Sequence, residues 1–348
     1  MDHTDGSISR PLTGRVGGMR MQAGQSDEKA VFNLYRDYPF PQTTPEQRRA
    51  LLPYQIAKYR AFGVEEAWKG RVLEVGCGTG RTMAVPKHYG TKLYVGIDQS
   101  EASLAYAKNV AVEDGVTCFR PLAASLFSIP FPDDTFDLVT CWGVLHCTPD
   151  PVKGLREMVR VCRPGGYVAF FVFNPFAHWR HEIQRWRVRR EAGDDVQARF
   201  KVAHRIYGGK PIEQMQPHEF VGLVDRYCVP IETTHSYAQL LAWLNEVGMD
   251  YQGTSPPLRM REFVVYMQTL ADEQARNPEA RLSTPFLRFM NGAARAAKWL
   301  PGMTRPQGAS ARPTILHRAF WQTLLAWNGR RSDQSVGASF CGRKRPKS

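Results

Sequence analysis

Three alternate glycines, Gly76, Gly78 and Gly80, have the spacing that most directly indicates ligand binding in this sequence, and they follow an apolar run typical of a buried strand. A turn without Cβ atoms lets the backbone approach a ligand closely, although a tight strand-to-helix turn uses glycines in the same way. Asp98 ends the next apolar run, 22 residues after Gly76, where a carboxylate can hold both hydroxyls of a ribose or merely cap the following helix. Together, the order and spacing of these residues predict a nucleoside-binding site.

The third glycine comes one residue too early for a dinucleotide site, because Arg81 occupies the last glycine position of the GxGxxG pattern. The sequence here resembles the class I S-adenosylmethionine-dependent methyltransferase family, of the type 11/12 kind, whose first motif is E/D-x-G-x-G-x-G. Glu74 and the three glycines match it. Later segments that resemble the family, in order, are SIPFPDDTFDLV, GVLHCTPDP and LREMVRVCRPGGYV. The resemblance is close over residues 70 to 175 and looser over 234 to 255 and 336 to 344.

The resemblance implies S-adenosylmethionine as the cofactor, with its nucleoside held at successive strand ends. Asp98 would bind the ribose, and Gln99 would flank the adenine. Ser125 stands where the family often has Asp or Asn to receive the adenine amino group, and a serine hydroxyl can accept the same hydrogen bond. The backbone amide of Leu126 would then face the ring nitrogen.

The methionine end of the cofactor is assigned in the same way. Glu74 and the backbone of the glycine turn would hold the amino-acid part, and Trp142 and Gly143 would border it. The complete set of cofactor residues that the resemblance implies is Glu74, Gly76, Cys77, Gly78, Gly80, Asp98, Gln99, Ser125, Leu126, Trp142 and Gly143.

His146 is the candidate catalytic residue, because it would begin the helix after the fourth strand, close to the methyl-bearing sulfonium. Methyl transfer is an in-line displacement, in which the enzyme aligns nucleophile, methyl and sulfur and excludes water. A base is needed only for a nucleophile that arrives protonated. The alternative is a partly buried histidine bonded to the backbone. Aromatic residues that would contact a substrate, with ordinary packing as the equal alternative, are Tyr35, Tyr38, Tyr54 and Tyr207.

Apolar runs that alternate with helical stretches of about a dozen residues predict βαβ units, and the expected fold is a doubly wound, Rossmann-like, mostly parallel sheet of seven strands. Before it, short helices are predicted, broken at Pro39, Pro41 and Pro53, with Pro45 at a helix start. The expected organisation is a disordered tail (1–25), a helical lid (26–70), the cofactor-binding core (71–175), a helical insertion (176–231), a core helix and strand (232–255), a basic helical insertion (256–334), and a final strand with a basic terminus (335–348).

The composition, 43% hydrophobic and 23% charged, is that of a globular protein and excludes disordered and fibrous classes. The first 25 residues lack the apolar block of a secretory signal, and no apolar run of about 18 residues occurs, so a cytoplasmic location is expected. The cysteines form no CxxC pair and the histidines no HxxxH or HExxH pair, so no metal site is predicted.

The basic charge is concentrated at the C-terminus, where residues 280 to 348 hold thirteen Lys and Arg against one acid, Asp333. Within that region, 281 to 300 form an amphipathic helical pattern. Such a helix packs on the core or lies at an anionic membrane surface, and nucleic acid is the least favoured partner. The sequence therefore predicts methylation of a small organic molecule, hydrophobic or lipid-like in character, with peripheral membrane contact as an option. The alternative is an RNA- or anionic-surface-binding protein with the same fold and no small-molecule activity.

Overall fold

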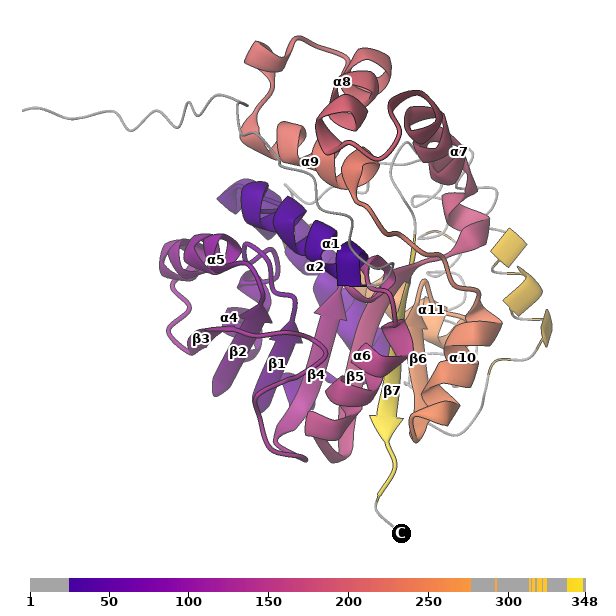
Figure 1. The fold of residues 1–348 in the computed structure, drawn as a ribbon. Coiled ribbons are helices and arrows are strands. Elements are labelled where there is room, and N and C mark those ends of the chain that lie inside the picture. Colours follow the sequence, from indigo (N-terminus) through magenta and orange to yellow (C-terminus); the bar gives the residue numbers. More distant parts are fainter. Residues whose placement is uncertain are drawn as a thin grey trace, which may run out of the picture.

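The computed structural model describes residues 25–276 and 337–346, with isolated residues at 292 and between 313 and 323. A seven-stranded sheet forms the centre of this part (Figure 1). Its order is β3-β2-β1-β4-β5-β7-β6, and β7 is antiparallel to both neighbours while the other paired strands are parallel. The predicted doubly wound, mostly parallel sheet of seven strands is confirmed. The strands are β1 (Arg71–Val75), β2 (Leu93–Asp98), β3 (Phe119–Ala123), β4 (Phe136–Trp142), β5 (Cys162–Phe173), β6 (Met249–Ser255) and β7 (Gly337–Lys344).

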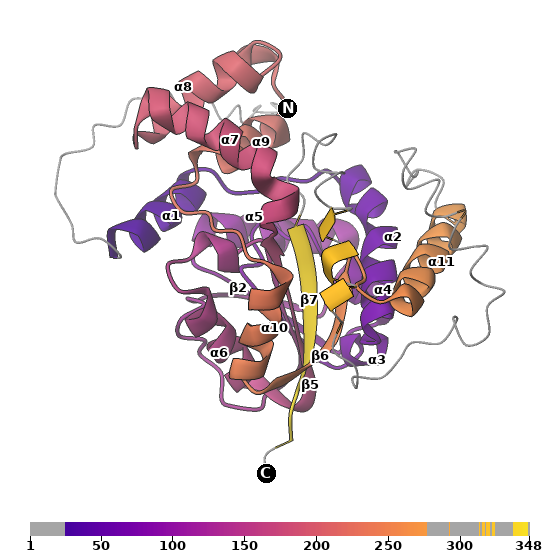
Figure 2. The ribbon, with the colours of Figure 1, turned by 90° about the vertical axis from the view of Figure 1, so that its right-hand side faces the viewer.

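Helices cover both faces of the sheet, because its central strands are apolar on both sides. One face is covered by α6 (Pro151–Val161) and α10 (Tyr237–Glu246) (Figure 2). The helices that pack on the opposite face are α2 (Pro45–Phe62), α3 (Glu65–Trp68), α4 (Ala84–Tyr89) and α5 (Glu101–Asp114). The helix α11 (Met260–Arg276) lies along α2.

The helix α2 begins where the sequence predicts, but it does not end where the sequence predicts. The Thr44 hydroxyl accepts a hydrogen bond from the Gln47 amide, and Pro45 occupies the first turn. The predicted break at Pro53 is wrong, since α2 continues through this buried proline. A proline inside a helix costs about 3 kcal/mol. The burial of α2 between the sheet and α11 outweighs that cost, which no local pattern reveals.

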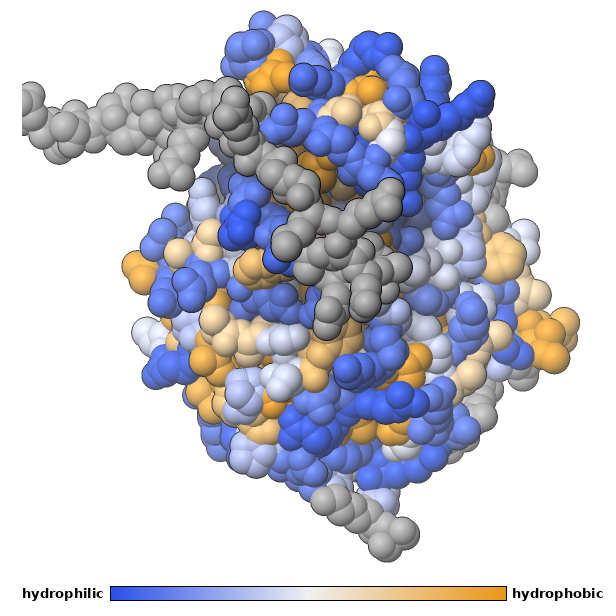
Figure 3. Space-filling view, in the orientation of Figure 1, coloured by the Kyte–Doolittle hydropathy of each residue, from blue (hydrophilic) through white to orange (hydrophobic). Residues whose placement is uncertain are grey.

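A separate group of helices covers the carboxyl edge of the parallel strands (Figure 1). We call α7 (Pro175–Ala192), α8 (Val196–Tyr207), the 3-10 turn η2 (Ile212–Gln214) and α9 (Pro217–Cys228) the cap. The cap has its own apolar core, which includes Leu34 of α1 (Gln25–Asp37) and Cys147 of the 3-10 turn η1 (Leu145–Cys147). Its surface in Figure 3 is mostly hydrophilic, with separate apolar patches.

Among the described residues, no helix is long and apolar enough to cross a bilayer. The amphipathic segment predicted for residues 281 to 300 lies outside the described residues.

Candidate active site

The glycine turn lies between β1 and α4, at the carboxyl edge of the sheet. Gly76 and Gly78 have φ values of +67° and +50°, a region that side chains rarely adopt. A Cβ on Gly78 would lie 2.7 Å from the carbonyl oxygen of Phe40. Glycine is therefore required here both by the backbone conformation and by the close approach of a second segment.

That second segment, residues 38 to 44, crosses the glycine turn, and we call it the strap. The Thr79 amide donates to the Phe40 carbonyl oxygen at 3.4 Å, and the Gln42 amide donates to Thr79 Oγ1 at 3.2 Å. The strap joins α1 to α2 and shields this edge of the sheet from solvent. The helical lead-in predicted as a lid thus contacts the turn directly.

Asp98 ends β2 and points toward the turn. Its Oδ2 accepts a hydrogen bond from the Gly78 amide, and its Oδ1 accepts one from the Ser100 amide, both at 2.9 Å. Burial raises the pKa of the carboxyl group, and these backbone hydrogen bonds act in the opposite direction. Each oxygen keeps a further lone pair, so the carboxylate orders the turn and can still accept the two hydroxyls of a ribose. The N-cap of α5 is Ser100, whose hydroxyl accepts from the Ser103 amide, so Asp98 does not cap this helix.

Gln99 and Ser125, assigned to the adenine, lie together. Gln99 Nε2 donates to Ser125 Oγ at 3.0 Å, and the Phe127 amide donates to the same oxygen at 3.2 Å. Both lone pairs of the hydroxyl are then used, so Ser125 is left as a donor and not as the acceptor that the sequence suggested. Leu126 is buried beside it.

Glu74 is enclosed within the fold. Its Oε2 accepts hydrogen bonds from the hydroxyls of Thr82 and Tyr94, and burial raises its pKa to about 7. Two of its acceptor sites are therefore occupied by the chain itself. The Glu74 side chain is held beneath the glycine turn by these hydrogen bonds. Only its Oε1 atom is left for another partner.

Lys58, on α2, is a group that the sequence did not single out. Its Nζ lies 3.5 Å from the centre of the Trp142 ring, and burial lowers the pKa of the ammonium group to about 7. A Cβ on the adjacent Gly143 would meet nothing within 4 Å, so there is open space on that side. Lys58 therefore lies at the end of β4, where the resemblance to the methyltransferase family places the methionine part of the cofactor. Only the helix–sheet packing places it there.

His146 lies in η1 and is almost fully buried. Its ring centre is 4.2 Å from that of Phe173, at the end of β5. Burial lowers the pKa of the imidazole to about 4, so the ring is neutral at physiological pH. Its Nδ1 is buried and has no hydrogen-bond partner within the described part of the chain. The ring can therefore accept a proton, but only as a weak base.

Three of the four tyrosines predicted to contact a substrate lie at the junction of α1 and the cap. The Tyr35 hydroxyl donates to Asp225 Oδ1 at 2.7 Å, and Tyr38 lies 6.0 Å from Phe220 between ring centres. Tyr207 stacks on Tyr227 at 4.8 Å. These contacts form an aromatic layer above the carboxyl edge of the sheet. Tyr54, in contrast, lies on α2, near Tyr266 of α11.

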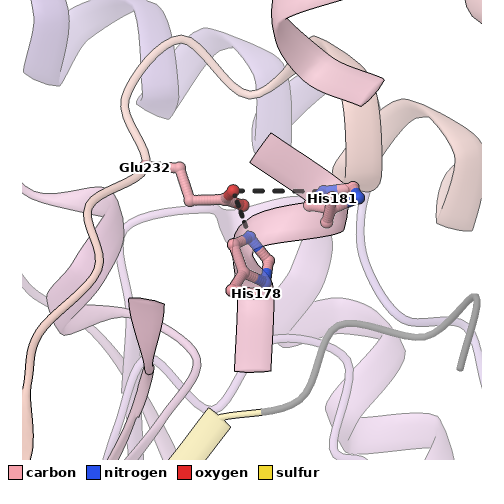
Figure 4. A group of neighbouring side chains, drawn as sticks. All are labelled: His178, His181 and Glu232. Atoms are coloured by element: carbon pink, nitrogen blue, oxygen red, sulfur yellow. Dashed lines mark hydrogen bonds and ion pairs between the residues drawn. The ribbon is translucent and has the colours of Figure 1, made fainter. Parts of the chain in front are cut away.

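A buried polar cluster, absent from the predicted site, links α7 to the segment after α9 (Figure 4). His178 Nε2 lies 2.9 Å and His181 Nε2 4.0 Å from Glu232 Oε1, and all three side chains are buried. His178 also stacks on Phe173 at 4.0 Å, on the ring that contacts His146. The two histidines are spaced i, i+3, so they share one helix face. That spacing was the only sequence signal, and Glu232 joins through tertiary packing.

Groups of this kind can hold a metal ion, since one ligand atom from each residue lies within 4.8 Å of the others. Here, however, Arg185 Nε lies 3.3 Å from Glu232 Oε1 and already supplies a positive charge. His181 Nε2 lies 3.0 Å from the Arg226 carbonyl oxygen, where the protonated nitrogen donates. Arg185 therefore balances the charge of Glu232, and its guanidinium would repel a metal cation at the same carboxylate. The evident role of the cluster is to hold α7 against the core.

Residues 73–170 match a protein family described as a methyltransferase domain. Phosphatidylethanolamine N-methyltransferase of Cereibacter sphaeroides is 38% identical over 109 residues, which cover 31% of this chain and 52% of that protein. Ubiquinone biosynthesis O-methyltransferase of Pseudomonas fluorescens (strain SBW25) is 37% identical over 105 residues, covering 30% and 44%. The chain thus spans about half the length of these curated relatives. The solved structure of the YcgJ protein of Bacillus subtilis is 17% identical to this chain, with a TM-score of 0.41. The match covers 83% of this chain and all of that one.

Proposed function

We propose that this chain, whose residues 73–170 match a family described as a methyltransferase domain, is a class I methyltransferase that transfers a methyl group from S-adenosylmethionine to a small hydrophobic or lipid-like molecule. The observation that carries the proposal is the pairing of the glycine turn with Asp98. A glycine turn, in which a Cβ on Gly78 would collide with the Phe40 carbonyl oxygen, lies against a carboxylate with free lone pairs, at the carboxyl edge of a parallel sheet. Ligands of open α/β sheets bind at that edge.

The residues around the turn suit the chemical parts of the cofactor. Asp98 can accept the ribose hydroxyls, while Gln99 and the Ser125 hydroxyl can bind the polar edge of the adenine. Lys58 can pair with the methionine carboxylate, and the open space at Gly143 leaves room beside it. When bound, the cofactor supplies a methyl group already activated by a positive sulfonium.

The chain itself then has to orient the nucleophile and exclude water. The strap shields the turn, and the cap places its aromatic layer above the carboxyl edge. Alignment within such an enclosure lowers the entropic part of the barrier. The neutral imidazole of His146 lies against Phe173, at the end of β5. In this proposal it accepts a proton only from a nucleophile whose acidity rises as the methyl group is transferred. A nucleophile that arrives neutral with a free lone pair needs no base.

Support for a lipid-like substrate comes from two sources. Tyr35, Tyr38 and Tyr207 give the cap an aromatic lining. Two of the relatives described above are named for phosphatidylethanolamine and for ubiquinone biosynthesis, both of which are lipid chemistries. The alignments cover about 30% of this chain, and we place the substrate contacts in the cap.

The test is to incubate the full chain with methyl-labelled S-adenosylmethionine and cell extract, and to measure the label in lipid, RNA and polar small-molecule fractions. We expect enzyme-dependent label in the lipid or small-molecule fraction. Label confined to RNA would refute the proposed substrate class. No transfer to any fraction, with intact cofactor binding, would favour a binding protein with this fold.

A further inference from the structure

Helix α7 buries three polar side chains and exposes its large apolar side chains. His178, His181 and Arg185 are buried. The exposed side chains, with their exposed fractions, are Phe176 (44%), Trp179 (39%), Ile183 (56%) and Trp186 (58%). At 3.6 residues per turn these four lie within an arc of about 80°, opposite the buried polar residues. This is the reverse of an ordinary surface helix, whose apolar stripe faces the core.

The inward face alone accounts for the attachment of α7. His178 bonds Glu232, and Arg185 donates to the carbonyl oxygens of Arg226 and Val229 at 3.1 and 2.8 Å. The exposed aromatic face is therefore not needed to hold the helix in place. A contiguous group of large apolar side chains in solvent is unfavourable, and in proteins it commonly marks an interaction surface.

The charges beside this face select the kind of partner. Arg180, Arg187 and Arg190 border it along the helix, and the Arg190 guanidinium lies 5.3 Å from the centre of the Trp186 ring. Of the two acids of α7, Glu191 forms an ion pair with Arg205. Glu182 accepts a hydrogen bond from the Thr234 hydroxyl and keeps its negative charge, but the three arginines outnumber it. The face is thus basic as well as aromatic.

We propose that the outer face of α7, formed by Phe176, Trp179, Ile183 and Trp186, docks on an anionic lipid bilayer. Tryptophan and arginine suit the headgroup region, because an apolar ring or stem enters the lipid while the polar end stays hydrated. Basic residues add attraction to anionic lipid. The helix would lie in the plane of the interface, in the manner of peripheral amphipathic helices.

The position of α7 gives this docking a consequence for the site. The helix begins two residues after Phe173, the residue whose ring contacts His146. It forms the outer side of the cap in Figures 1 and 2. A bilayer on this face would therefore lie beside the carboxyl edge of the sheet. Docking itself requires no methyl transfer, so it is tested independently of the proposed function.

The experiment is co-sedimentation of the full chain with vesicles of phosphatidylcholine, alone or mixed with phosphatidylglycerol. We expect binding to the mixed vesicles that weakens as salt is raised, because screening shortens the reach of the charges. Replacing Trp179 and Trp186 together by Ala should lower the partition coefficient at least about tenfold, which corresponds to about 1.4 kcal/mol. Replacing Arg187 and Arg190 by Gln should weaken binding to the mixed vesicles alone.

A matched control on another helix is Tyr106→Ala with Lys108→Gln on α5, which removes an exposed aromatic side chain and an exposed cation. It should bind as the wild type does. Circular dichroism and binding of S-adenosylhomocysteine should be unchanged in every variant, since the altered side chains are exposed. Quenching of tryptophan fluorescence by brominated lipid should fall in the double tryptophan variant.

The proposal is overturned if the wild type does not bind the mixed vesicles at low salt, which would leave the face for a protein partner. It is also overturned if the double tryptophan variant binds as well as the wild type. That second result would assign membrane binding to another part of the chain, such as its basic C-terminal residues.

Discussion

Replacing Asp98 should separate the two roles that the structure gives its carboxylate. Two hydrogen bonds from ribose hydroxyls to a charged acceptor are worth about 2 kcal/mol or more in total, so Asp98→Ala should weaken S-adenosylhomocysteine binding at least about thirtyfold. The same change leaves the amides of Gly78 and Ser100 without their acceptor. Each such loss costs roughly 1 to 3 kcal/mol when the group is buried, so the unfolding free energy should also fall.

Asp98→Asn is the matched variant, because its carbonyl oxygen can still accept one of the two amide hydrogen bonds. It should retain more of the stability than Asp98→Ala, while affinity still falls because the charge is lost. Isothermal titration calorimetry gives the affinity, and urea denaturation without ligand gives the stability. If both variants bind the ligand as tightly as the wild type, Asp98 only orders the backbone at Gly78 and Ser100, and the ribose assignment is wrong.

Three further predictions follow from the same geometry. S-adenosylmethionine should raise the melting temperature and NAD should not, since a ligand that binds only the folded state stabilises it; the reverse result in differential scanning fluorimetry would contradict the cofactor assignment. His146→Ala should leave cofactor affinity nearly unchanged and lower turnover, and an equal loss of both would make it a packing residue. Burial raises the pKa of Asp225 to about 6, above its unfolded value of about 3.9. Asp225 therefore contributes to the free energy of unfolding below a pH of about 4, and this contribution is lost as the pH rises through about 6. The loss is at most about 3 kcal/mol. Asp225→Asn should remove this part of the pH dependence of unfolding, and an unchanged profile would assign it to other groups.

The fold could be predicted from the sequence because its signals are local. Each central strand is a short apolar run, and the turn after β1 requires glycine for reasons of backbone geometry. The last strand, β7, was also found from its apolar pattern alone, although it pairs with β5 more than 160 residues earlier. A strand needs only its own periodicity to be recognised, whatever its partner.

The side-chain environment of the site could not be predicted in the same way. Ser125 was assigned as an acceptor, but Gln99 and Phe127 already use its lone pairs. Lys58 reaches Trp142 only because α2 packs on that face of the sheet. The buried polar face of α7 could not be predicted from the sequence, because the interpretation of helical periodicity rests on apolar residues facing the core. Each of these depends on a tertiary contact that spacing does not encode.

Helix α1 connects the strap to the cap, and so it joins the cofactor side of the proposed site to the substrate side. The strap reaches the cofactor turn through the Phe40 carbonyl oxygen, and α1, which precedes it, reaches the cap through the bond from Tyr35 to Asp225. The Ser100 hydroxyl also donates to the Tyr35 carbonyl oxygen at 3.2 Å, just past Asp98. One helix therefore joins the glycine turn and Asp98 to α9. Since α7 is bonded to the segment that follows α9, the same series of contacts extends to the proposed membrane-facing surface.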